Sequence, residues 1–518
     1  MKRLLVRKDS YYDSVFLMLI SKDVRQVEGV IRAEVAMGTV MNLELLGEMN
    51  LSGPELDDAG ANDLIIALEV EDEAAGVAAE EKVQELLRKK SQTGVDTYRH
   101  SSITAAFEAE TDTNLVLFSI PGQFAPREVR RALRAGKHVM IFSDNVSVEA
   151  EIELKALARE QGLLLMGPDC GTAIINGKPL CFANVVNSGS IGVISASGTG
   201  LQEVTCAIHN GGGGVSQAIG TGGRDLKSEA IGGSTTLMAI EALAQDESTA
   251  VIVVISKPPA PAVAEKVISA LEQAGKPAVV HLIGIEKPPA TGTIQYPGSL
   301  EEAAKAAIAL SNGTPLKRRV FDASDDEIEK IVDRETASVS SSQKYLRGYY
   351  TGGTLTDEAV FLLNEDLGGI YSFDPADPAY RLVDPHVSQK HTIVDLGEDV
   401  FTVGRPHPMI DPSTRTDRME RDAQDAEIAV VLLDCVIGYG SHPDPAGAVA
   451  PAIRQMRSAA AQRGGYVVVI ASVTGTNQDF QNKSSQIQTL RDAGAVVMPS
   501  NFQAAALARR IMARLEAR

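Results

Sequence analysis

A glycine-rich turn between a strand and a helix is the feature that most constrains this chain. Residues 192–203 read Gly-Val-Ile-Ser-Ala-Ser-Gly-Thr-Gly-Leu-Gln-Glu. We expect a short apolar strand, a turn of small residues over 195–200, and a helix from Leu201 onward. Such a helix leaves its first amides free and directs its dipole at the turn, which favours a bound anion. A plain helix capped by Ser197 or Thr199 is the alternative for a single turn of this kind.

The turn recurs twice. Residues 349–358 read Tyr-Tyr-Thr-Gly-Gly-Thr-Leu-Thr-Asp-Glu and share the order Gly-Thr-x-x-x-Glu with the first copy. A third turn of small residues, 436–442, follows an apolar strand at 430–435. Strand-to-helix turns in two α/β units predict paired helix N-termini around a shared anion.

Composition narrows the class of protein. The 518 residues are enough for roughly three or four domains. A net charge of −19 argues against nucleic acid or an acidic membrane surface as a partner. No apolar run approaches the roughly 20 residues of a membrane span, and early charges at the N-terminus argue against a secretory signal. The four cysteines are scattered, which is typical of reduced thiols. We therefore expect a cytoplasmic protein with a small anionic substrate.

Strand and helix patterns predict an α/β protein of several domains. Residues 1–98 alternate like a ferredoxin-like α+β domain, and 99–186 like a truncated Rossmann-like unit of parallel strands. Residues 187–317 and 345–518 form two further α/β units, joined by a linker over 318–344 with an acidic helix and a serine-rich end.

Three further features are candidate site residues. Lys257 follows an apolar strand and precedes two prolines, at the strand edge where open α/β sheets bind ligands; a solvated surface lysine is the alternative. His442 closes the third turn and is a candidate proton donor, or else a solvated loop histidine. The proline-rich loop 404–412 contributes Arg405 and His407 as candidate substrate contacts. The histidine spacing predicts no metal site.

The motifs also carry a family likeness. Residues 119–121 (Ser-Ile-Pro), 167–171 (Gly-Pro-Asp-Cys-Gly) and 194–199 (Ile-Ser-Ala-Ser-Gly-Thr) resemble the α subunit of succinyl-CoA synthetase. Residues 345–518 resemble the CoA-ligase domain of its β subunit. The whole chain resembles the FdrA family of acyl-CoA-synthetase-like proteins.

The resemblance implies a Rossmann-like CoA-binding-type unit, two flavodoxin-like CoA-ligase-type domains and a phosphate held between two helix N-termini. Carried over, the phosphate-binding residues are Ser197, Gly198, Thr199, Gly438, Tyr439 and Gly440. The implied substrate contacts are Gly352, Gly353, Thr354 and Cys170. We expect Cys170 to lie near the substrate and to pack there, not to react with it.

Four departures from the synthetases change the expected chemistry. The ATP-grasp domain is absent. The loop that carries the phosphorylated histidine in the synthetases reads Gly-Ile-Glu-Lys-Pro-Pro-Ala-Thr at 284–291, and His281 lies within the preceding strand. Lys257 stands where the synthetases have a glutamate that supports that histidine, and a lysine suits an anionic ligand directly. The glycine-rich loop that opens the CoA-binding domain is replaced by residues 1–98.

The surviving half-reaction is attack of phosphate on an acyl carbonyl. The FdrA resemblance implies an oxamate carbamoyltransferase subunit in purine-ureide (allantoin) breakdown, which converts oxalurate and phosphate into oxamate and carbamoyl phosphate. One alternative is an acyl-CoA synthetase component that takes its ATP half from a partner; another is a non-catalytic scaffold subunit. Phosphate is the expected co-substrate and CoA a further candidate. The expected assembly is a homo-oligomer within a complex of other subunits.

Overall fold

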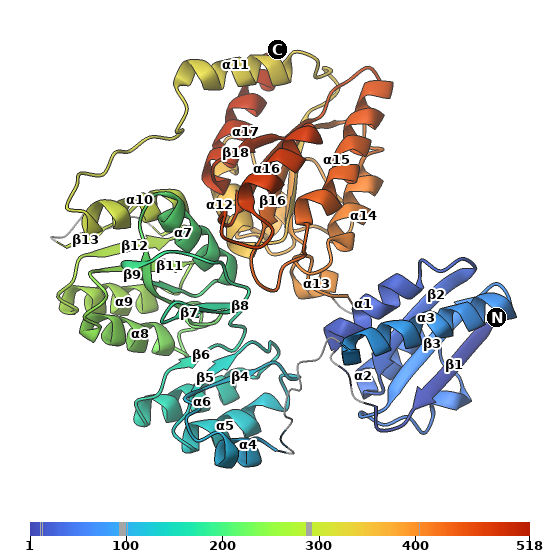
Figure 1. Cartoon of the computed structure of the whole chain (residues 1–518). Coiled ribbons are helices and arrows are strands. Elements are labelled where there is room, and N and C mark those ends of the chain that lie inside the picture. The colour runs from blue at the N-terminus through green and yellow to red at the C-terminus, as the bar shows by residue number, and fades with distance from the viewer. Residues whose placement is uncertain (11, 13, 93–99, 101, 286–292, 403–404) are drawn as a thin grey trace. The chain divides into compact units, whose positions relative to one another are not determined.

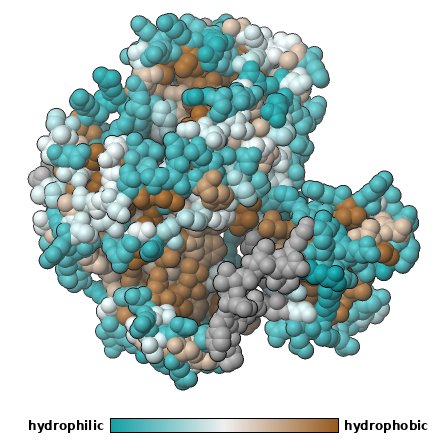
Figure 2. Space-filling model, viewed as in Figure 1, coloured by the Kyte–Doolittle hydropathy of each residue, from teal (hydrophilic) through white to brown (hydrophobic). Residues whose placement is uncertain are grey.

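The computed structural model describes residues 1–518 except 11, 13, 93–99, 101, 286–292 and 403–404. The chain forms two compact units, one of residues 1–101 with 399–407 and one of residues 102–398 with 408–518. Most of the face drawn in Figure 2 is hydrophilic, and apolar residues gather in its lower centre. None of the described helices is long and apolar enough to cross a membrane.

The N-terminal domain packs helices on both faces of a three-stranded antiparallel sheet, ordered β1-β3-β2. β3 is central and reads as one apolar run because both of its faces are buried. This is the predicted ferredoxin-like layout without a fourth strand among the described residues. The elements are β1 (Lys2–Arg7), α1 (Ser14–Val24), β2 (Val30–Met37), α2 (Val40–Glu48), η1 (Pro54–Leu56), β3 (Leu64–Val70) and α3 (Glu73–Gln92).

The small parallel domain has a three-stranded sheet ordered β4-β5-β6, as expected for a truncated Rossmann-like unit. The buried Lys155 of α6 joins it to the next domain, with Nζ 2.7 Å from Asp225 and 2.8 Å from Glu151. The elements are α4 (Ile103–Ala109), β4 (Leu115–Phe118), α5 (Ala125–Arg134), β5 (His138–Ile141), α6 (Val148–Glu160) and β6 (Leu165–Met166).

The middle domain (residues 172–311) has the strand order β13-β12-β11-β9-β10-β7-β8. Strands β9 to β13 are parallel, and the hairpin β7–β8 adds an antiparallel edge. The sequence predicted a domain boundary at residue 186. In the structure β7, which precedes that residue, pairs with β10, which follows it. The elements are β7 (Thr172–Ile175), β8 (Lys178–Cys181), β9 (Ser188–Ser195), α7 (Gly198–Asn210), β10 (Val215–Gly220), α8 (Ser234–Gln245), β11 (Val251–Ser256), α9 (Pro261–Gln273), β12 (Ala278–Leu282), β13 (Ile294–Gln295) and α10 (Leu300–Ser311).

The C-terminal domain (residues 325–398 and 408–518) has a five-stranded parallel sheet ordered β15-β14-β16-β17-β18. Figure 1 draws this domain in yellow to red, around the strand labelled β16. The elements are α11 (Asp325–Thr336), β14 (Tyr345–Tyr350), α12 (Gly353–Leu363), η2 (Pro378–Tyr380), β15 (Thr392–Asp395), α14 (Ser413–Asp422), β16 (Ile428–Val436), α15 (Pro445–Gln462), β17 (Val468–Thr474), α16 (Lys483–Asp492), β18 (Val496–Met498) and α17 (Asn501–Glu516). The short helix α13 (Asp399–Thr402) belongs to the N-terminal unit.

The segment predicted to be a linker is partly structured. Helix α11 buries Ile328 and Val332 and forms ion pairs with α17, including Arg510 to Glu329 at 3.0 Å. The acidic helix is therefore part of the C-terminal domain.

The middle and C-terminal domains share one winding. In each, the first strand (β9 or β14) lies between the second and the third, which gives the flavodoxin-like order 2-1-3-4-5. One hydrophobic core cluster includes residues of α7 and α10 from the middle domain and of α12 and α17 from the C-terminal domain. Ligands of such sheets bind at the carboxyl ends of the strands, where the order reverses.

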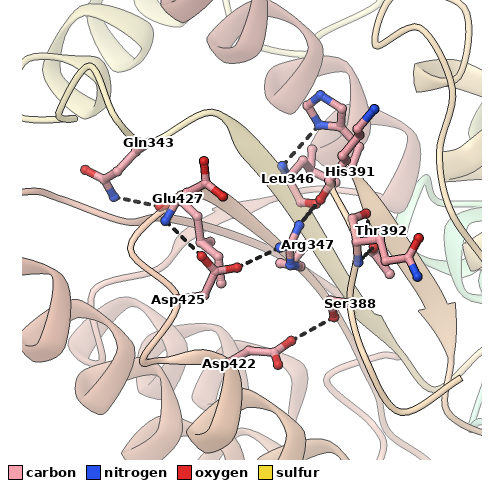
Figure 3. A network of polar contacts seen from close by, with 12 residues as sticks. Gln343, Leu346, Arg347, Ser388, His391, Thr392, Asp422, Asp425 and Glu427 are labelled. Atoms are coloured by element: carbon pink, nitrogen blue, oxygen red, sulfur yellow. Dashed lines mark hydrogen bonds and ion pairs between the residues drawn. The ribbon is translucent and has the colours of Figure 1, made fainter. Parts of the chain in front are cut away.

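A buried polar network closes the opposite end of the C-terminal sheet (Figure 3). Arg347 of β14 donates to Asp425 at 2.7 Å, and Gln343 donates to the Ile428 carbonyl at 2.6 Å. His391 accepts from the Leu346 amide at 3.2 Å, and burial lowers its pKa to about 4. Gln343, His391 and Asp425 directly precede β14, β15 and β16, and Arg347 lies near the start of β14, so the network stabilises the amino end of the sheet.

Candidate functional site

Two of the three predicted turns lead into a helix at the carboxyl end of the first strand of their domain. α7 starts at Gly198, and its N-cap Ser197 accepts a hydrogen bond from the Gly200 amide at 3.2 Å. α12 starts at Gly353, and its N-cap Gly352 has no side chain to occupy the helix amides. The chain order strand–small residues–helix therefore forms as the sequence predicted in both copies.

These two helix N-termini meet. Thr354 Oγ1 donates to Ser197 Oγ across the domain interface. A Cβ atom on Gly352 would lie 2.9 Å from Thr199 Cγ2, and one on Gly200 would lie 3.0 Å from Thr354 Cγ2. The turns need glycine because of this close approach, which brings the positive ends of two helix dipoles to one place.

The third turn requires a correction to the predicted pairing. The Gly438 amide donates to Gln481 Oε1 at 3.1 Å, and the Tyr439 amide donates to the Ala183 carbonyl at 2.8 Å. The helix that follows, α15, already has a carboxylate at its N-terminus, because Asp444 accepts from the Gly447 amide at 3.0 Å. Gly440 packs against the Phe182 ring. The contact that the structure gives the Ser197 turn is thus with the Gly352–Thr354 turn, for which the resemblance implied a substrate role.

Lys257 lies at the same place, directly after β11. A Cβ atom on Gly353 would lie 2.5 Å from Lys257 Nζ and 2.6 Å from Asp395 Oδ2. Lys257 Nζ is 3.5 Å from Asp357 of α12, and 39% of the lysine side chain is exposed. Burial lowers the pKa of Lys257, but Asp357, Asp395 and Glu398 outweigh it and raise the pKa above its ordinary value. The lysine is thus a firmly charged group between the two domains.

The carboxylates around Lys257 were not predicted. Burial raises the pKa of Asp395 to about 7, against the opposing effect of Lys257. Asp395 ends β15 in the C-terminal domain, in the same kind of strand-end position that marked Lys257. That position was the available signal, but the sequence alone does not show that strands of two different domains end at one point.

Asp434 holds the backbone that directly precedes α12. It is buried and accepts from the Thr351 amide at 2.9 Å and from Arg415 at 3.0 Å. Burial raises the pKa of Asp434 even though Arg415 lowers it. The backbone before Gly352 is therefore held by a buried ion pair.

His442, Arg405 and His407 make contacts of their own. His442 accepts from the Asp444 amide at Nδ1, 3.0 Å, and its own amide donates to the Met409 carbonyl. Arg405 and His407 belong to the N-terminal unit, where burial lowers the pKa of His407 to about 4. Burial raises the pKa of Glu34 in that unit against the opposing charges of Arg25 and Arg405. The roles expected for the three residues stay predictions.

Cys170 lines a small pocket at the start of α7. The pocket is bounded by residues 169–172, by residues 195–198, and by Gly220 and Gly222. Cys170 is 2% exposed, and its thiol donates to the Thr172 carbonyl at 3.6 Å. Burial raises its pKa to about 12, so the thiol is a poor nucleophile.

The loop that would carry a phosphorylated histidine lies mostly outside the described residues, which omit 286–292. His281 itself is buried in β12, with Nδ1 3.3 Å from the Pro297 carbonyl. It lines an apolar pocket with Tyr296 and with Phe361 of α12.

Three segments of the chain match known families. Residues 349–511 match the family described as CoA-ligase, and residues 186–284 match the CoA binding domain. Residues 1–102 match the family described as AllF, heavy metal-associated domain. That segment contains no cysteine, so it lacks the thiolates that soft metals prefer. Nor do the described residues group three or more His, Cys, Asp or Glu side chains around a metal position.

One relative matches the whole chain, and other proteins match parts of it. YahF of Escherichia coli K12, described as uncharacterized, is 44% identical over 515 residues, 99% of each chain. The α subunit of an ADP-forming succinate–CoA ligase of Methanothermobacter thermautotrophicus is 26% identical over 52% of this chain and 85% of that protein. An acetyl-coenzyme A synthetase of Candidatus Korarchaeum cryptofilum covers 78% of this chain and 84% of its own at 15% identity, with a TM-score of 0.32.

Proposed function

Because the chain belongs to the FdrA family of acyl-CoA-synthetase-like proteins, we propose that it binds inorganic phosphate at the meeting point of α7 and α12 and uses it to accept an acyl group. The acyl group proposed is carbamoyl, with oxalurate and phosphate giving oxamate and carbamoyl phosphate. The single observation that carries the proposal is the contact of two helix N-termini beside Lys257.

The charges around the site suit this role. Each helix N-terminus supplies about half a positive charge and Lys257 supplies a full one. Asp357, Asp395 and Glu398 counter the charge of Lys257, and Asp395, with a pKa of about 7, is partly protonated at neutral pH. Phosphate would accept hydrogen bonds from the first amides of both helices, with Ser197, Thr199 and Thr354 hydroxyls at the same turns.

The transfer balances without a protein nucleophile. A phosphate oxygen attacks the carbamoyl carbon, the C–O bond forms and the C–N bond breaks. The leaving nitrogen takes the proton that HPO₄²⁻ carried. Asp395, with a pKa of about 7, is suited to relay that proton, and the paired dipoles and Lys257 stabilise the developing oxyanion.

The experiment is the reverse reaction. The full chain, alone and co-expressed with the products of neighbouring genes, is incubated with carbamoyl phosphate and oxamate. We expect phosphate release that depends on oxamate, with oxalurate as the product. A chain that binds phosphate but forms no oxalurate with or without those products contradicts the carbamoyl assignment.

A CoA-ligase component is the second candidate, favoured by the matches to the CoA binding and CoA-ligase families. It predicts CoA-dependent acyl transfer with a partner subunit that supplies ATP chemistry. Incubation with ATP or an acyl phosphate should then label a histidine, which mass spectrometry detects as an acid-labile adduct. Our proposal predicts no labelled histidine.

A further inference from the structure

Glu203 and Glu358 occupy equivalent positions in the two helices that meet at the site. Each lies five residues after the first residue of its helix, Gly198 or Gly353, and so about one and a half turns below the N-terminus. They are the last residue of the repeated Gly-Thr-x-x-x-Glu order. The two side chains are buried, 5% and 3% exposed, which is unusual for glutamate unless it is paired.

Each carboxylate crosses the interface between the two domains. Glu358, in the C-terminal domain, accepts from the Leu300 amide at 2.9 Å, the first residue of α10 in the middle domain. Glu203, in the middle domain, accepts from the Asn501 amide at 3.4 Å, the first residue of α17 in the C-terminal domain. Each repeated glutamate therefore caps the last helix of the other domain, where the helix dipole favours a negative charge.

Asn501 ties the two caps together. Its amide faces Glu203, while its Nδ2 donates to Glu358 and to the Leu355 carbonyl of α12, both at 2.9 Å. The Thr474 hydroxyl, at the end of β17, donates to the other oxygen of Glu203. The network thus connects α7, α12, α10 and α17.

We propose that Glu203 and Glu358 are positioning residues that set where the N-termini of α7 and α12 stand relative to one another, an inference that rests on the proposed phosphate site. A hydrophobic interface of small and aliphatic residues resists separation, but it gives weak directional control over sliding. Two buried hydrogen-bonded caps, one from each helix, supply that control. Because a helix is rigid over two turns, fixing it at the glutamate also fixes its first amides.

The variants are Glu203→Gln and Glu358→Gln, which keep the shape of the side chain. Glu358 accepts one N–H donor at each of its two oxygens. In glutamine the remaining oxygen can accept from one donor, while the NH2 group faces the other N–H and leaves that donor without an acceptor. Glu203 has one hydroxyl partner, Thr474, which can rotate to accept from the new amide. We therefore expect the Glu358 variant to be the more severe of the two.

Glu301→Gln is the matched control. Glu301 is buried in the same interface and accepts from Ser500 Oγ at 2.6 Å and from Gln503 Nε2 at 2.8 Å. It belongs to α10, which does not end at the paired turns. Its loss should lower stability without moving the site.

Two readouts are taken on the full-length variants. Calorimetric titration with inorganic phosphate should show Kd raised on the order of 10-fold in Glu358→Gln, less in Glu203→Gln, and within twofold of wild type in Glu301→Gln. Amide hydrogen exchange should show faster exchange in the first turns of α7 and α12 for the first two variants only.

The outcomes separate the two ideas. If the wild-type chain binds phosphate and both site variants bind it equally well, the positioning role is refuted while the proposed function stands. If Glu301→Gln weakens phosphate binding as much as Glu358→Gln, the effect is general destabilisation and the positioning role is again refuted. If the wild-type chain binds no phosphate, the proposed function fails. The exchange readout then tests the positioning role by itself, and unchanged amide exchange in the first turns of α7 and α12 of both site variants would refute it.

Discussion

Thr354 and Ser197 are 157 positions apart in the chain, yet the hydroxyl of one donates to the hydroxyl of the other. The two residues hold neighbouring places in the repeated turns: Ser197 is the N-cap of α7, whereas Thr354 is the second residue of α12 and corresponds to Thr199. This hydrogen bond holds the two helix N-termini in close contact. The first prediction tests how tightly the two turns pack.

Gly200→Ala should destabilise the chain although it improves the helix propensity of α7. Propensity alone predicts a gain of up to about 1 kcal/mol. The new Cβ would lie 3.0 Å from Thr354 Cγ2, and such overpacking typically costs about 1–3 kcal/mol. Chemical denaturation should therefore show a net loss.

Two further variants check the cause. Thr354→Ser removes the crowded methyl group and keeps the hydroxyl, so it should recover most of the loss in the double variant. Gly47→Ala in α2, where a Cβ would meet nothing within 4 Å, should stabilise. A loss in Gly200→Ala that Thr354→Ser leaves untouched would contradict the steric explanation.

Local patterns predicted most of the fold but not which turns meet. The strand–turn–helix order predicted parallel α/β units, and the family resemblance implied their flavodoxin-like winding. The pairing of Ser197 with Gly352–Thr354, and not with Gly438, depends on an interface between domains. In the third turn the amides bond to Gln481 and Ala183, residues far away in sequence. Lys257 was visible as a strand-end lysine, but its partners Asp357 and Asp395 come from the other domain and carry no local signal.

Stability should fall as the pH rises from about 4.5 to about 7, partly because of Glu358. Burial raises its pKa from 4.5 to about 7, with Glu203 and Glu301 as like-charged neighbours and Leu300 and Asn501 as donors. A carboxyl group whose pKa is higher in the folded chain stabilises the fold fully at pH values below its unfolded pKa. That stabilisation is lost as the pH rises from the unfolded to the folded pKa, here from about 4.5 to about 7. The loss from this group is roughly 3 kcal/mol at most.

Urea denaturation at pH 5 and pH 8 measures this effect. Glu358→Gln does not titrate, so its stability should change less between the two pH values than that of wild type. Asp63, whose pKa backbone hydrogen bonds lower to about 2, gives the opposite sign, with stability lost only as the pH falls below about 4. Equal pH slopes in wild type and Glu358→Gln would show that Glu358 is charged in the folded chain at all these pH values.

Cys170 should be dispensable for turnover although it lines the pocket beside α7. Its thiol is buried and its pKa is about 12, so little thiolate exists at neutral pH. Cys170→Ser should keep phosphate binding and oxamate-dependent phosphate release within a few-fold of wild type. Abolished turnover in a variant with unchanged thermal unfolding would identify a catalytic thiol instead.

Lys257→Met should weaken phosphate binding and slow transfer by roughly two to three orders of magnitude. The methionine keeps the packing of the lysine stem and removes only the charge. That positive charge lies beside Gly353, where the two helix dipoles meet, and the neighbouring carboxylates carry the opposite charge. Lys257→Arg, which retains the charge, should recover part of the phosphate affinity.

Lys305→Met is the matched control for the charge. Lys305 is about as exposed as Lys257, at 35% against 39%, and pairs with Glu301 and Asp322 away from the turns. Its loss tests what removing any paired lysine of this unit does to stability. If phosphate Kd and transfer rate change equally in Lys257→Met and Lys305→Met, Lys257 is a structural ion pair and the anion is held by the helix dipoles alone. A loss confined to Lys257→Met, with thermal unfolding similar in the two variants, assigns the third positive charge of the phosphate site to Lys257.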